Sequence, residues 1–94
     1  MFDVNEYFDG KVKSLSFTDA SGDKATVGVM AAGEYTFGTS SIELMTVTSG
    51  SMQVKLPGSD NWQSFTAGET FRVEANQSFD VKMDSDTSYL CIYQ

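Results

Sequence analysis

The chain of 94 residues carries thirteen acidic and six basic side chains, which gives a net charge of −7, and 40% of its residues are apolar. This length predicts one domain, spanning residues 1–94, with enough apolar residues to bury a core of its own. The acidic balance argues against nucleic-acid binding, because phosphate contacts need a basic face. There is no histidine and one cysteine, Cys91, which excludes histidine-based catalysis, histidine-ligated metal sites and an internal disulfide bond.

No stretch of the sequence approaches the roughly 20 consecutive apolar residues of a membrane-spanning helix. Residues 1–10 contain acids where a signal peptide has bases, and they include no apolar segment of the kind that a signal peptide needs. We therefore expect a soluble cytoplasmic protein that does not bind membranes.

Alternation of apolar and polar residues predicts a chain built almost entirely of strands. A short helical turn over residues 3–8 is the one exception that we expect. The alternation is clearest in residues 51–56, and residues 88–93 are apolar on both faces, which predicts a central position in a sheet. Many short strands with frequent turn residues are typical of an all-β sandwich or barrel. In chain order, we expect strands over residues 12–17, 25–30, 33–37, 42–48, 51–56, 62–65, 69–74, 78–83 and 88–93.

Two segments resemble the two sequence motifs of the cupin family. In residues 33–50, Glu43 is followed by six residues and then by Gly50, as in the first motif. In residues 67–79, Gly68 opens a strand, as in the second motif. The resemblance implies a single-domain, all-β, cupin-like β-barrel of the jelly-roll type. Metal-binding cupins carry histidines at positions that this chain fills with other residues, so we expect no metal site; these are Phe37, Thr39, Ser41 and Phe79.

Nearly the whole chain is similar to the bacterial pyrimidine/purine nucleoside phosphorylase family, whose members are small single-domain cupins. The matching segments are residues 5–14, 27–30, 33–37, 43–47 and 87–91, together with Trp62 and Gln63. The resemblance implies phosphorolysis of purine and pyrimidine ribonucleosides to a free base and α-D-ribose 1-phosphate. Nucleosides and inorganic phosphate would then be its partners, and we expect no metal or other cofactor. A cupin that binds a small molecule without catalysis is the alternative function.

Glu43 is the candidate catalytic residue. Alternation places Glu43 on the same face of its strand as Met45 and Val47, and cupin phasing points that face into the barrel. A carboxylate among apolar neighbours is costly to bury, so its presence indicates a function. Two roles are open: Glu43 can accept hydrogen bonds from ribose hydroxyls, or hold a proton for the departing base when burial raises its pKa. A solvated carboxylate at the mouth of the barrel is the alternative.

Four further residues are candidates for binding the nucleoside. Tyr35 and Thr39 share a strand face that the same phasing points inward, and an aromatic ring there can stack on a base without reading its identity. Tyr89 lies on one face of the last strand, where ordinary core packing is the alternative, as it is for Tyr35. Gln63 is placed to contact a base or ribose edge, unless it lies on a surface hairpin.

Phosphate binding by an acidic chain requires a local positive charge. Lys13 is the preferred phosphate ligand; a solvated lysine is the alternative for it, and backbone N–H groups at Gly33 or Gly38 can hold phosphate without any side chain. Cys91 is expected to pack rather than react, since no basic neighbour is visible that would lower its pKa. An open barrel exposes strand edges, and pairing of the N-terminal strands into a homodimer would cover them.

Overall fold

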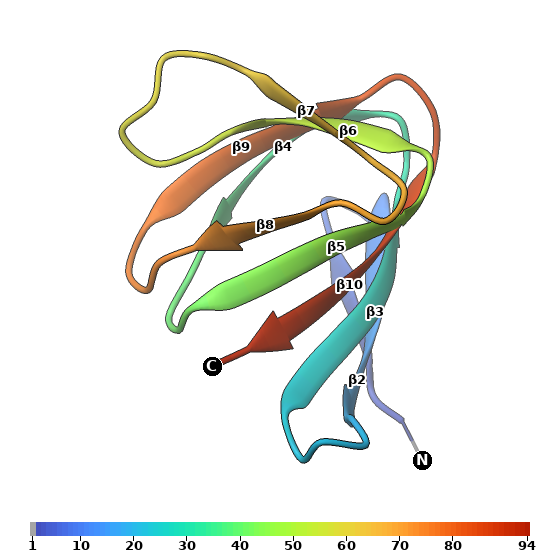
Figure 1. The fold of residues 1–94 in the computed structure, drawn as a ribbon. Coiled ribbons are helices and arrows are strands. Elements are labelled where there is room, and N and C mark those ends of the chain that lie inside the picture. The colour runs from blue at the N-terminus through green and yellow to red at the C-terminus, as the bar shows by residue number, and fades with distance from the viewer. Residues whose placement is uncertain (1) are drawn as a thin grey trace.

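Alternating polar and apolar residues form ten strands in the computed structural model, which describes residues 2–94 (Figure 1). The nine strands that the sequence predicts are all present, and their ends differ from the prediction by at most one residue. In chain order the strands are β1 (Val4–Tyr7), β2 (Val12–Thr18), β3 (Lys24–Met30), β4 (Gly33–Gly38), β5 (Glu43–Ser49), β6 (Ser51–Lys55), β7 (Gln63–Thr66), β8 (Thr70–Val73), β9 (Ser78–Met83) and β10 (Thr87–Tyr93).

The strands form two antiparallel sheets that face each other (Figure 1). One sheet has six strands in the order β1-β2-β3-β10-β5-β8, and the other has four in the order β4-β9-β6-β7. β10 lies between β3 and β5, as the apolar character of both its faces predicts. Two packed antiparallel sheets joined by connections that cross between them make a jelly roll, so the predicted all-β, cupin-like fold is confirmed.

The N-terminal segment is a strand, and the short helical turn predicted over residues 3–8 is wrong. β1 pairs with β2 along its whole length, with Val4 opposite Leu15. Asn5 Nδ2 also donates a hydrogen bond to Ser16 Oγ at 2.9 Å. A segment this short does not hold an isolated helix, because nucleation is costly, whereas the free edge of β2 offers a ready row of hydrogen-bond partners.

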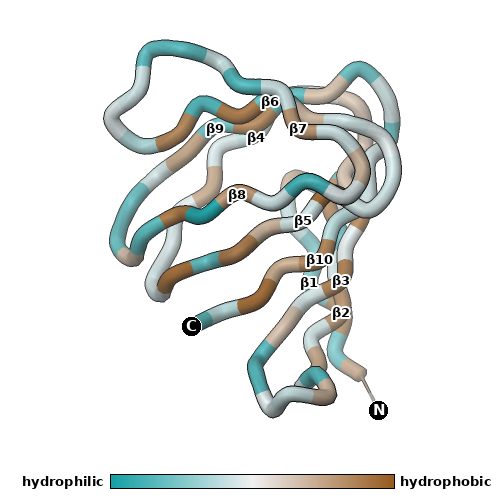
Figure 2. Tube along the Cα trace, viewed as in Figure 1, coloured by the Kyte–Doolittle hydropathy of each residue, from teal (hydrophilic) through white to brown (hydrophobic). Residues whose placement is uncertain are grey.

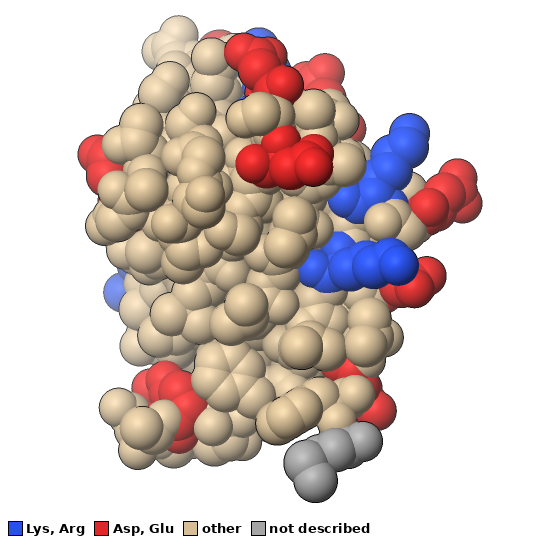
Figure 3. Space-filling model, turned by 90° about the vertical axis from the view of Figure 1, so that its right-hand side faces the viewer, with Lys and Arg blue, Asp and Glu red and all other residues tan. Residues whose placement is uncertain are grey.

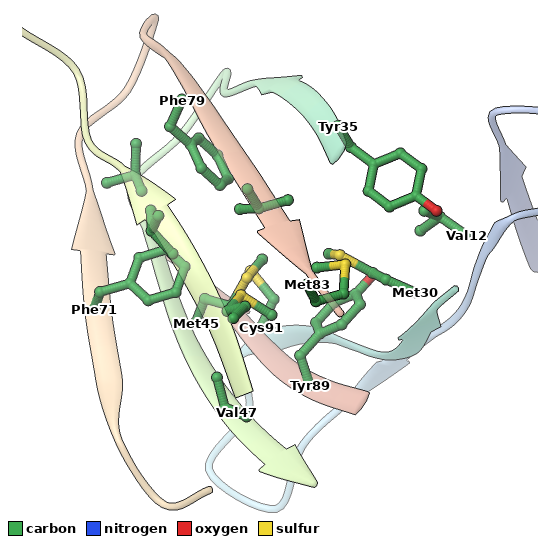
Figure 4. Packing of buried hydrophobic residues seen from close by; sticks show 14 residues of the cluster. Val12, Met30, Tyr35, Met45, Val47, Phe71, Phe79, Met83, Tyr89 and Cys91 are labelled. Atoms are coloured by element: carbon green, nitrogen blue, oxygen red, sulfur yellow. The ribbon is translucent and has the colours of Figure 1, made fainter. Parts of the chain in front are cut away.

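The core lies between the two sheets. Apolar residues point inward at every second position of most strands, and Figure 2 shows the resulting alternation of brown and teal along the chain. Figure 4 shows the sulfur atoms of methionines and of Cys91 between the aromatic rings of the two sheets. Removing these side chains from water supplies most of the favourable free energy of folding. The fully buried side chains include Val12, Met30, Val47, Met52, Val54, Val73, Val81, Thr87 and Cys91.

The four-stranded sheet covers only part of the six-stranded sheet. The β2–β3 hairpin projects beyond the strands of the smaller sheet (Figure 1). The tip of the hairpin is a loop over residues 19–23, where Asp19 Oδ1 accepts hydrogen bonds from the backbone N–H groups of Ser21 and Asp23, each at 2.9 Å. The inner face of this hairpin and the end of β10 are thus left open. Residues 2–94 contain no helix of the length and apolar character that crossing a membrane requires.

Candidate active site

A cavity of about 390 Å³ opens between the two sheets, where β5 begins and β10 ends. Its size lies within the range of small-molecule sites, about 300–1,000 Å³. Its polar side chains include those of Glu43 and Ser14, which lie on the inner faces of β5 and β2. Six aromatic residues also line the cavity: Tyr7, Phe8, Phe37, Phe79, Tyr89 and Tyr93.

Glu43 is the first residue of β5, and it lines the cavity on the inner face, as predicted. Its Oε1 accepts a hydrogen bond from Cys91 Sγ at 3.6 Å. Burial raises the pKa of Glu43 above its usual range, and the hydrogen bond from Cys91 opposes that shift. A half-buried carboxyl group can accept hydrogen bonds from hydroxyl groups, and its raised pKa favours the protonated form more than in water.

Three groups beside Glu43 stay protonated at neutral pH. Burial raises the pKa of Tyr89 to about 12 and that of Cys91 to about 12, and the charge of Glu43 adds to both shifts. Burial also raises the pKa of Tyr93. Cys91 is therefore a thiol and not a thiolate nucleophile, in agreement with the prediction that it packs rather than reacts. The two tyrosine hydroxyls remain available as hydrogen-bond donors.

The ring of Tyr89 reaches across a glycine of the neighbouring strand. Gly28 lies opposite Tyr89 on β10 and opposite Ser14 on β2. A Cβ atom at Gly28 would lie 2.5 Å from both Cζ and the hydroxyl oxygen of Tyr89, which is closer than nonbonded atoms approach. The missing side chain thus gives the ring room to hydrogen-bond with Ser14. A side chain at Gly28 would therefore displace the Tyr89 ring from its present position.

Phe8 closes one side of the cavity from a turn with unusual backbone geometry. The turn places Phe8, Asp9 and Gly10 at φ values of 54°, 58° and 84°. A left-handed conformation is uncommon for a bulky residue and indicates a local constraint. The Phe8 ring centre lies 4.9 Å from that of Tyr35 and 5.5 Å from that of Phe37. The turn therefore brings an N-terminal ring onto the aromatic side of the cavity.

Tyr35 lies in the core, behind the rings that face the cavity. It is 5% exposed, and its hydroxyl donates a hydrogen bond to the backbone oxygen of Ala31 at 2.7 Å. Figure 4 shows its hydroxyl beside Val12, away from the open end. Phe37, two residues along the same strand face, lines the cavity instead. The structure thus gives Tyr35 the core position that was its alternative.

Thr39 and Gln63 lie away from the cavity. Thr39 Oγ1 donates a hydrogen bond to the Glu74 backbone oxygen at 2.7 Å and accepts one from the Gln77 backbone nitrogen at 3.1 Å, which ties two loops together. Gln63 is exposed and pairs with Val54 in the β6–β7 hairpin. Thr39 thus has a structural role, and Gln63 lies on a surface hairpin.

Lys13 lies on the outer face of the six-stranded sheet. Its neighbours Val12 and Ser14 point inward, and Lys13 Nζ forms an ion pair with Glu6 Oε1 at 3.4 Å. Of the six residues predicted to form the site, Glu43 and Tyr89 are brought together in the cavity, whereas the structure does not bring Lys13 there. Its role as a phosphate ligand stays an untested prediction.

Five aromatic residues of the cavity are not among the site residues predicted from the sequence: Tyr7, Phe8, Phe37, Phe79 and Tyr93. Phe79 carries a signal, because it fills a metal-ligand position of the second cupin motif and such positions face the interior of the barrel. Its ring centre lies 5.9 Å from that of Phe37, which fills another such position. Within residues 2–94, no three His, Cys, Asp or Glu side chains gather where they could share a metal ion.

A profile of the pyrimidine/purine nucleoside phosphorylase family matches residues 2–93. A pyrimidine/purine nucleoside phosphorylase of Alcanivorax borkumensis is 61% identical over 93 residues, which cover 99% of this chain and 98% of that protein. The crystal structure of a Vibrio parahaemolyticus protein of unknown function matches with a TM-score of 0.94 and 46% identity, over 100% of this chain and 99% of that chain. A putative ethanolamine utilization protein of Salmonella typhimurium shares the fold alone, with a TM-score of 0.74 and 12% identity, over 99% of this chain and 93% of that chain. The chain therefore belongs to the pyrimidine/purine nucleoside phosphorylase family.

Proposed function

We propose that this protein cleaves purine and pyrimidine ribonucleosides with inorganic phosphate and releases a free base and α-D-ribose 1-phosphate. The observation that carries the proposal is a half-buried carboxyl group, Glu43, inside a cavity of about 390 Å³ whose other walls are largely aromatic. Family membership of the chain supports the same reaction. A nucleoside has two parts that such a cavity suits, a flat base and a sugar with several hydroxyls.

The reaction requires one bond to form and one to break at the anomeric carbon of ribose. An oxygen of phosphate forms a bond to that carbon, while the glycosidic bond breaks and its electron pair moves to the base nitrogen, which then takes up a proton. The sugar gains positive charge in the transition state, as in glycoside hydrolysis. Groups that hold the ribose and phosphate in place lower the barrier, because the reactants no longer lose freedom of motion in the reacting step.

Glu43 is proposed to hold the ribose hydroxyls. A carboxylate that accepts their hydrogen bonds pulls more strongly as the sugar becomes positive, so the contact favours the transition state over the bound nucleoside. The raised pKa of Glu43 supports a second role, in which the protonated group gives its proton to the departing base. These roles differ in their dependence on the base, since only the second changes between purines and pyrimidines.

The aromatic walls support broad base specificity. Phe8, Phe37 and Phe79 carry no polar atoms in their side chains, so they can stack on a base without distinguishing its hydrogen-bonding groups. Tyr93 adds a hydroxyl group to the same cavity, and this hydroxyl is hydrogen-bonded with Thr26 Oγ1 at 3.0 Å. Purines and pyrimidines would thus be bound chiefly by their flat surfaces.

The proposed reaction needs no metal ion or other cofactor. The support is the chemistry of the side chains at the cupin ligand positions: Phe37 and Phe79 offer no donor atom, and Thr39 is occupied with backbone groups. The proposal also includes a cytoplasmic location, which agrees with the single cysteine remaining a free thiol.

The proposed enzyme is a homodimer joined through its N-terminal strands. β1 is an edge strand, and beside it the outer face of the sheet exposes apolar side chains, among them Val4, Leu15, Val27 and Val29. Figure 3 views the molecule from the side on which β2 and β3 lie in Figure 1, and uncharged side chains cover most of that face. A twofold contact brings the same surface of each copy together, so an uncharged surface avoids repulsion between acidic chains.

Light scattering tests the dimer, with an expected mass of about twice 10.3 kDa. Val27→Glu would place like charges against each other at this face and is expected to give monomers. A monomeric wild type at micromolar concentration would contradict the proposal.

The activity is tested by incubating the protein with uridine or adenosine, with and without inorganic phosphate. We expect free base only when phosphate is present, ribose 1-phosphate in equal amount, and an unchanged rate after treatment with a chelator. Base release without phosphate would indicate hydrolysis instead. Binding of the nucleosides with no release of base would assign a non-catalytic binding function.

A further inference from the structure

A second pocket adjoins the cavity of Glu43. It has a volume of about 550 Å³ and lies on the inner face of the open β2–β3 hairpin. Tyr7 and Tyr93 line both the pocket and the cavity, so the two spaces meet at these two side chains. We refer to it as the hairpin pocket; its other polar side chains are Asn5, Ser16, Thr18, Lys24 and Thr26.

The charge of the hairpin pocket is opposite to that of the whole protein. The chain carries a net charge of −7, yet the described residues that line the pocket include Lys24 and no carboxylate. In contrast, the cavity beside it contains Glu43. The two adjoining spaces therefore differ in the sign of charge that they favour, and an anion is expected to prefer the hairpin pocket.

Lys24 is not neutralised by an acidic partner. The ion pairs within residues 2–94 join Lys13 to Glu6 and Arg72 to Glu74, and Lys24 is in neither. Lys24 begins β3 on the same strand face as Thr26, and it lies opposite Tyr93 of β10. Lys24 is exposed at the open side of the pocket, so its ammonium group can form an ion pair with a bound anion.

The hydrogen bonds already present in the pocket leave hydroxyl hydrogens free to donate. Asn5 Nδ2 donates to Ser16 Oγ at 2.9 Å, so the hydrogen of Ser16 is left for another acceptor. Thr26 Oγ1 and the Tyr93 hydroxyl lie 3.0 Å apart, and whichever of them donates, the hydrogen of the other is free. Anions are bound by such donors together with a cation, because charge-assisted hydrogen bonds are stronger than neutral ones.

We infer that the hairpin pocket binds inorganic phosphate, with Lys24 as its cationic ligand and, as hydroxyl donors, Ser16 and whichever of Thr26 and Tyr93 does not donate to the other. This inference rests on the proposed phosphorolysis, for which it supplies the position of the second substrate. A nucleoside in the cavity of Glu43 would present its ribose at the junction with the hairpin pocket, where phosphate can reach the anomeric carbon. Lys24 on the inner face thus takes the role of phosphate ligand that the sequence suggested for Lys13, which is paired with Glu6 on the outer face.

The test measures two properties of Lys24→Gln, Lys24→Arg and Lys55→Gln. The first property is equilibrium binding of inorganic phosphate, measured by calorimetry without nucleoside, and the second is the KM for phosphate and for uridine in phosphorolysis. Lys24→Gln removes the charge, Lys24→Arg keeps it, and Lys55→Gln removes a charge on the other sheet, where Lys55 lies over Trp62. We expect Lys24→Gln to weaken phosphate binding and raise the phosphate KM about 10-fold to 100-fold, with the KM for uridine unchanged.

A second variant tests the hydroxyl donors without removing any of them. Asn5→Asp keeps the shape of the side chain but accepts hydrogen bonds from Ser16, which turns the serine hydrogen away from the pocket and adds a negative charge. We expect weaker phosphate binding than in wild type, and Asn5→Ala to be affected less than Asn5→Asp.

The outcomes separate this inference from the proposed function. Phosphate binding that depends on Lys24 in a protein without phosphorolysis would refute the proposed reaction and keep the site. Phosphorolysis with unchanged phosphate binding and KM in Lys24→Gln would keep the reaction and overturn the site. A rise of the phosphate KM in Lys13→Gln but not in Lys24→Gln would also overturn it and return phosphate to the outer face.

Discussion

The inner face of β10 changes character along its length. At one end Thr87 is fully buried, and its hydroxyl donates to the backbone oxygens of Ser51 and Ser85, each at 3.1 Å. At the other end Tyr93 is only partly buried and lies on both the cavity and the hairpin pocket. The same alternation builds both ends, so the difference comes from the smaller sheet, which covers the first end and leaves the second open (Figure 1).

This difference indicates that the covered region and the open region of the fold have different roles. In the covered region, large side chains such as Phe71 and Met52 are packed away from water and stabilise the fold. In the open region, Glu43 and the hydroxyl groups stabilise the fold less than apolar side chains would, because burial of a polar group is less favourable. Substitutions in the covered region should therefore change stability, and those in the open region should change activity.

The largest expected effect is on stability, in the covered region. Phe71 is 5% exposed, and its ring centre lies 4.8 Å from that of Phe65. Phe71→Ala leaves a cavity that the two sheets cannot close, and we expect it to lower the free energy of unfolding by about 3–5 kcal/mol. Chemical denaturation measures the loss. Phe37→Ala, on the wall of the open cavity, is the matched control, with a smaller loss of stability and a raised KM for nucleosides.

The next largest expected effect is on catalysis, in the open region. Glu43→Gln keeps the shape of the side chain and removes its charge. We expect kcat/KM to fall about 10-fold to 1000-fold, which corresponds to about 1.4–4 kcal/mol of transition-state stabilisation. Uridine and inosine are compared, because they share the ribose and differ in the base.

Equal losses for both nucleosides would assign Glu43 to the ribose, and a loss confined to one would assign it to the base. Thermal melts should show no loss of stability, because the amide still accepts a hydrogen bond from Cys91 and carries no charge to bury. Unchanged kinetics with both substrates would leave Glu43 as a carboxyl group without a catalytic role.

A third effect joins the two regions through Gly28. Gly28→Ala places a methyl group against the Tyr89 ring, so we expect a loss of about 1–3 kcal/mol of stability, together with lower activity as the ring moves. Combining it with Tyr89→Leu removes the ring and is expected to restore stability but not activity. If Gly28→Ala alone leaves both properties unchanged, Gly28 does not position Tyr89. The double-mutant cycle gives the coupling between the two residues.

The sequence predicts the strands well because alternation is a local property. Residues 78–83 are predicted without error, since one face of β9 is buried along its whole length. Glu43 and Tyr89 are placed in the cavity by the same alternation. Alternation does not predict which residues of one strand face are covered by distant parts of the chain. Tyr35 and Phe37 share a face, but the ring that packs against Tyr35 is that of Phe8, which comes from the N-terminal turn.

The N-terminal contribution to the site depends on pairing between distant residues. Nothing within residues 3–8 indicates a strand until the free edge of β2 is present, so Tyr7 and Phe8 are not foreseen as cavity residues. Lys24 is not predicted as a phosphate ligand for a related reason. It is one of six cations in the chain, and only the open position of the hairpin distinguishes it from the others.

The smallest expected effect is a change in the pH dependence of stability. Burial raises the pKa of Glu43 above its ordinary value of 4.5, so the folded protein holds this proton more tightly than the unfolded chain does. The stability that Glu43 contributes is fully present below pH 4.5 and is lost as the pH rises through the raised pKa of the folded state. Glu69 acts in the opposite direction, because hydrogen bonds from Thr66 lower its pKa.

Comparing wild type with Glu43→Gln isolates the effect of Glu43, since Glu69 titrates in both. Glutamine does not titrate, so the melting temperature of the variant should rise relative to that of wild type as the pH increases from about 4 to about 7. Asp80→Asn is the control for loss of a carboxyl group, since Asp80 lies on the smaller sheet, where its Oδ1 accepts a hydrogen bond from Thr36. A difference between wild type and Glu43→Gln that stays constant over this range would mean that the cavity keeps Glu43 as well hydrated as it is in the unfolded chain. The open region would then be open to water as well as to ligand, and Glu43 would act in catalysis only as a carboxylate.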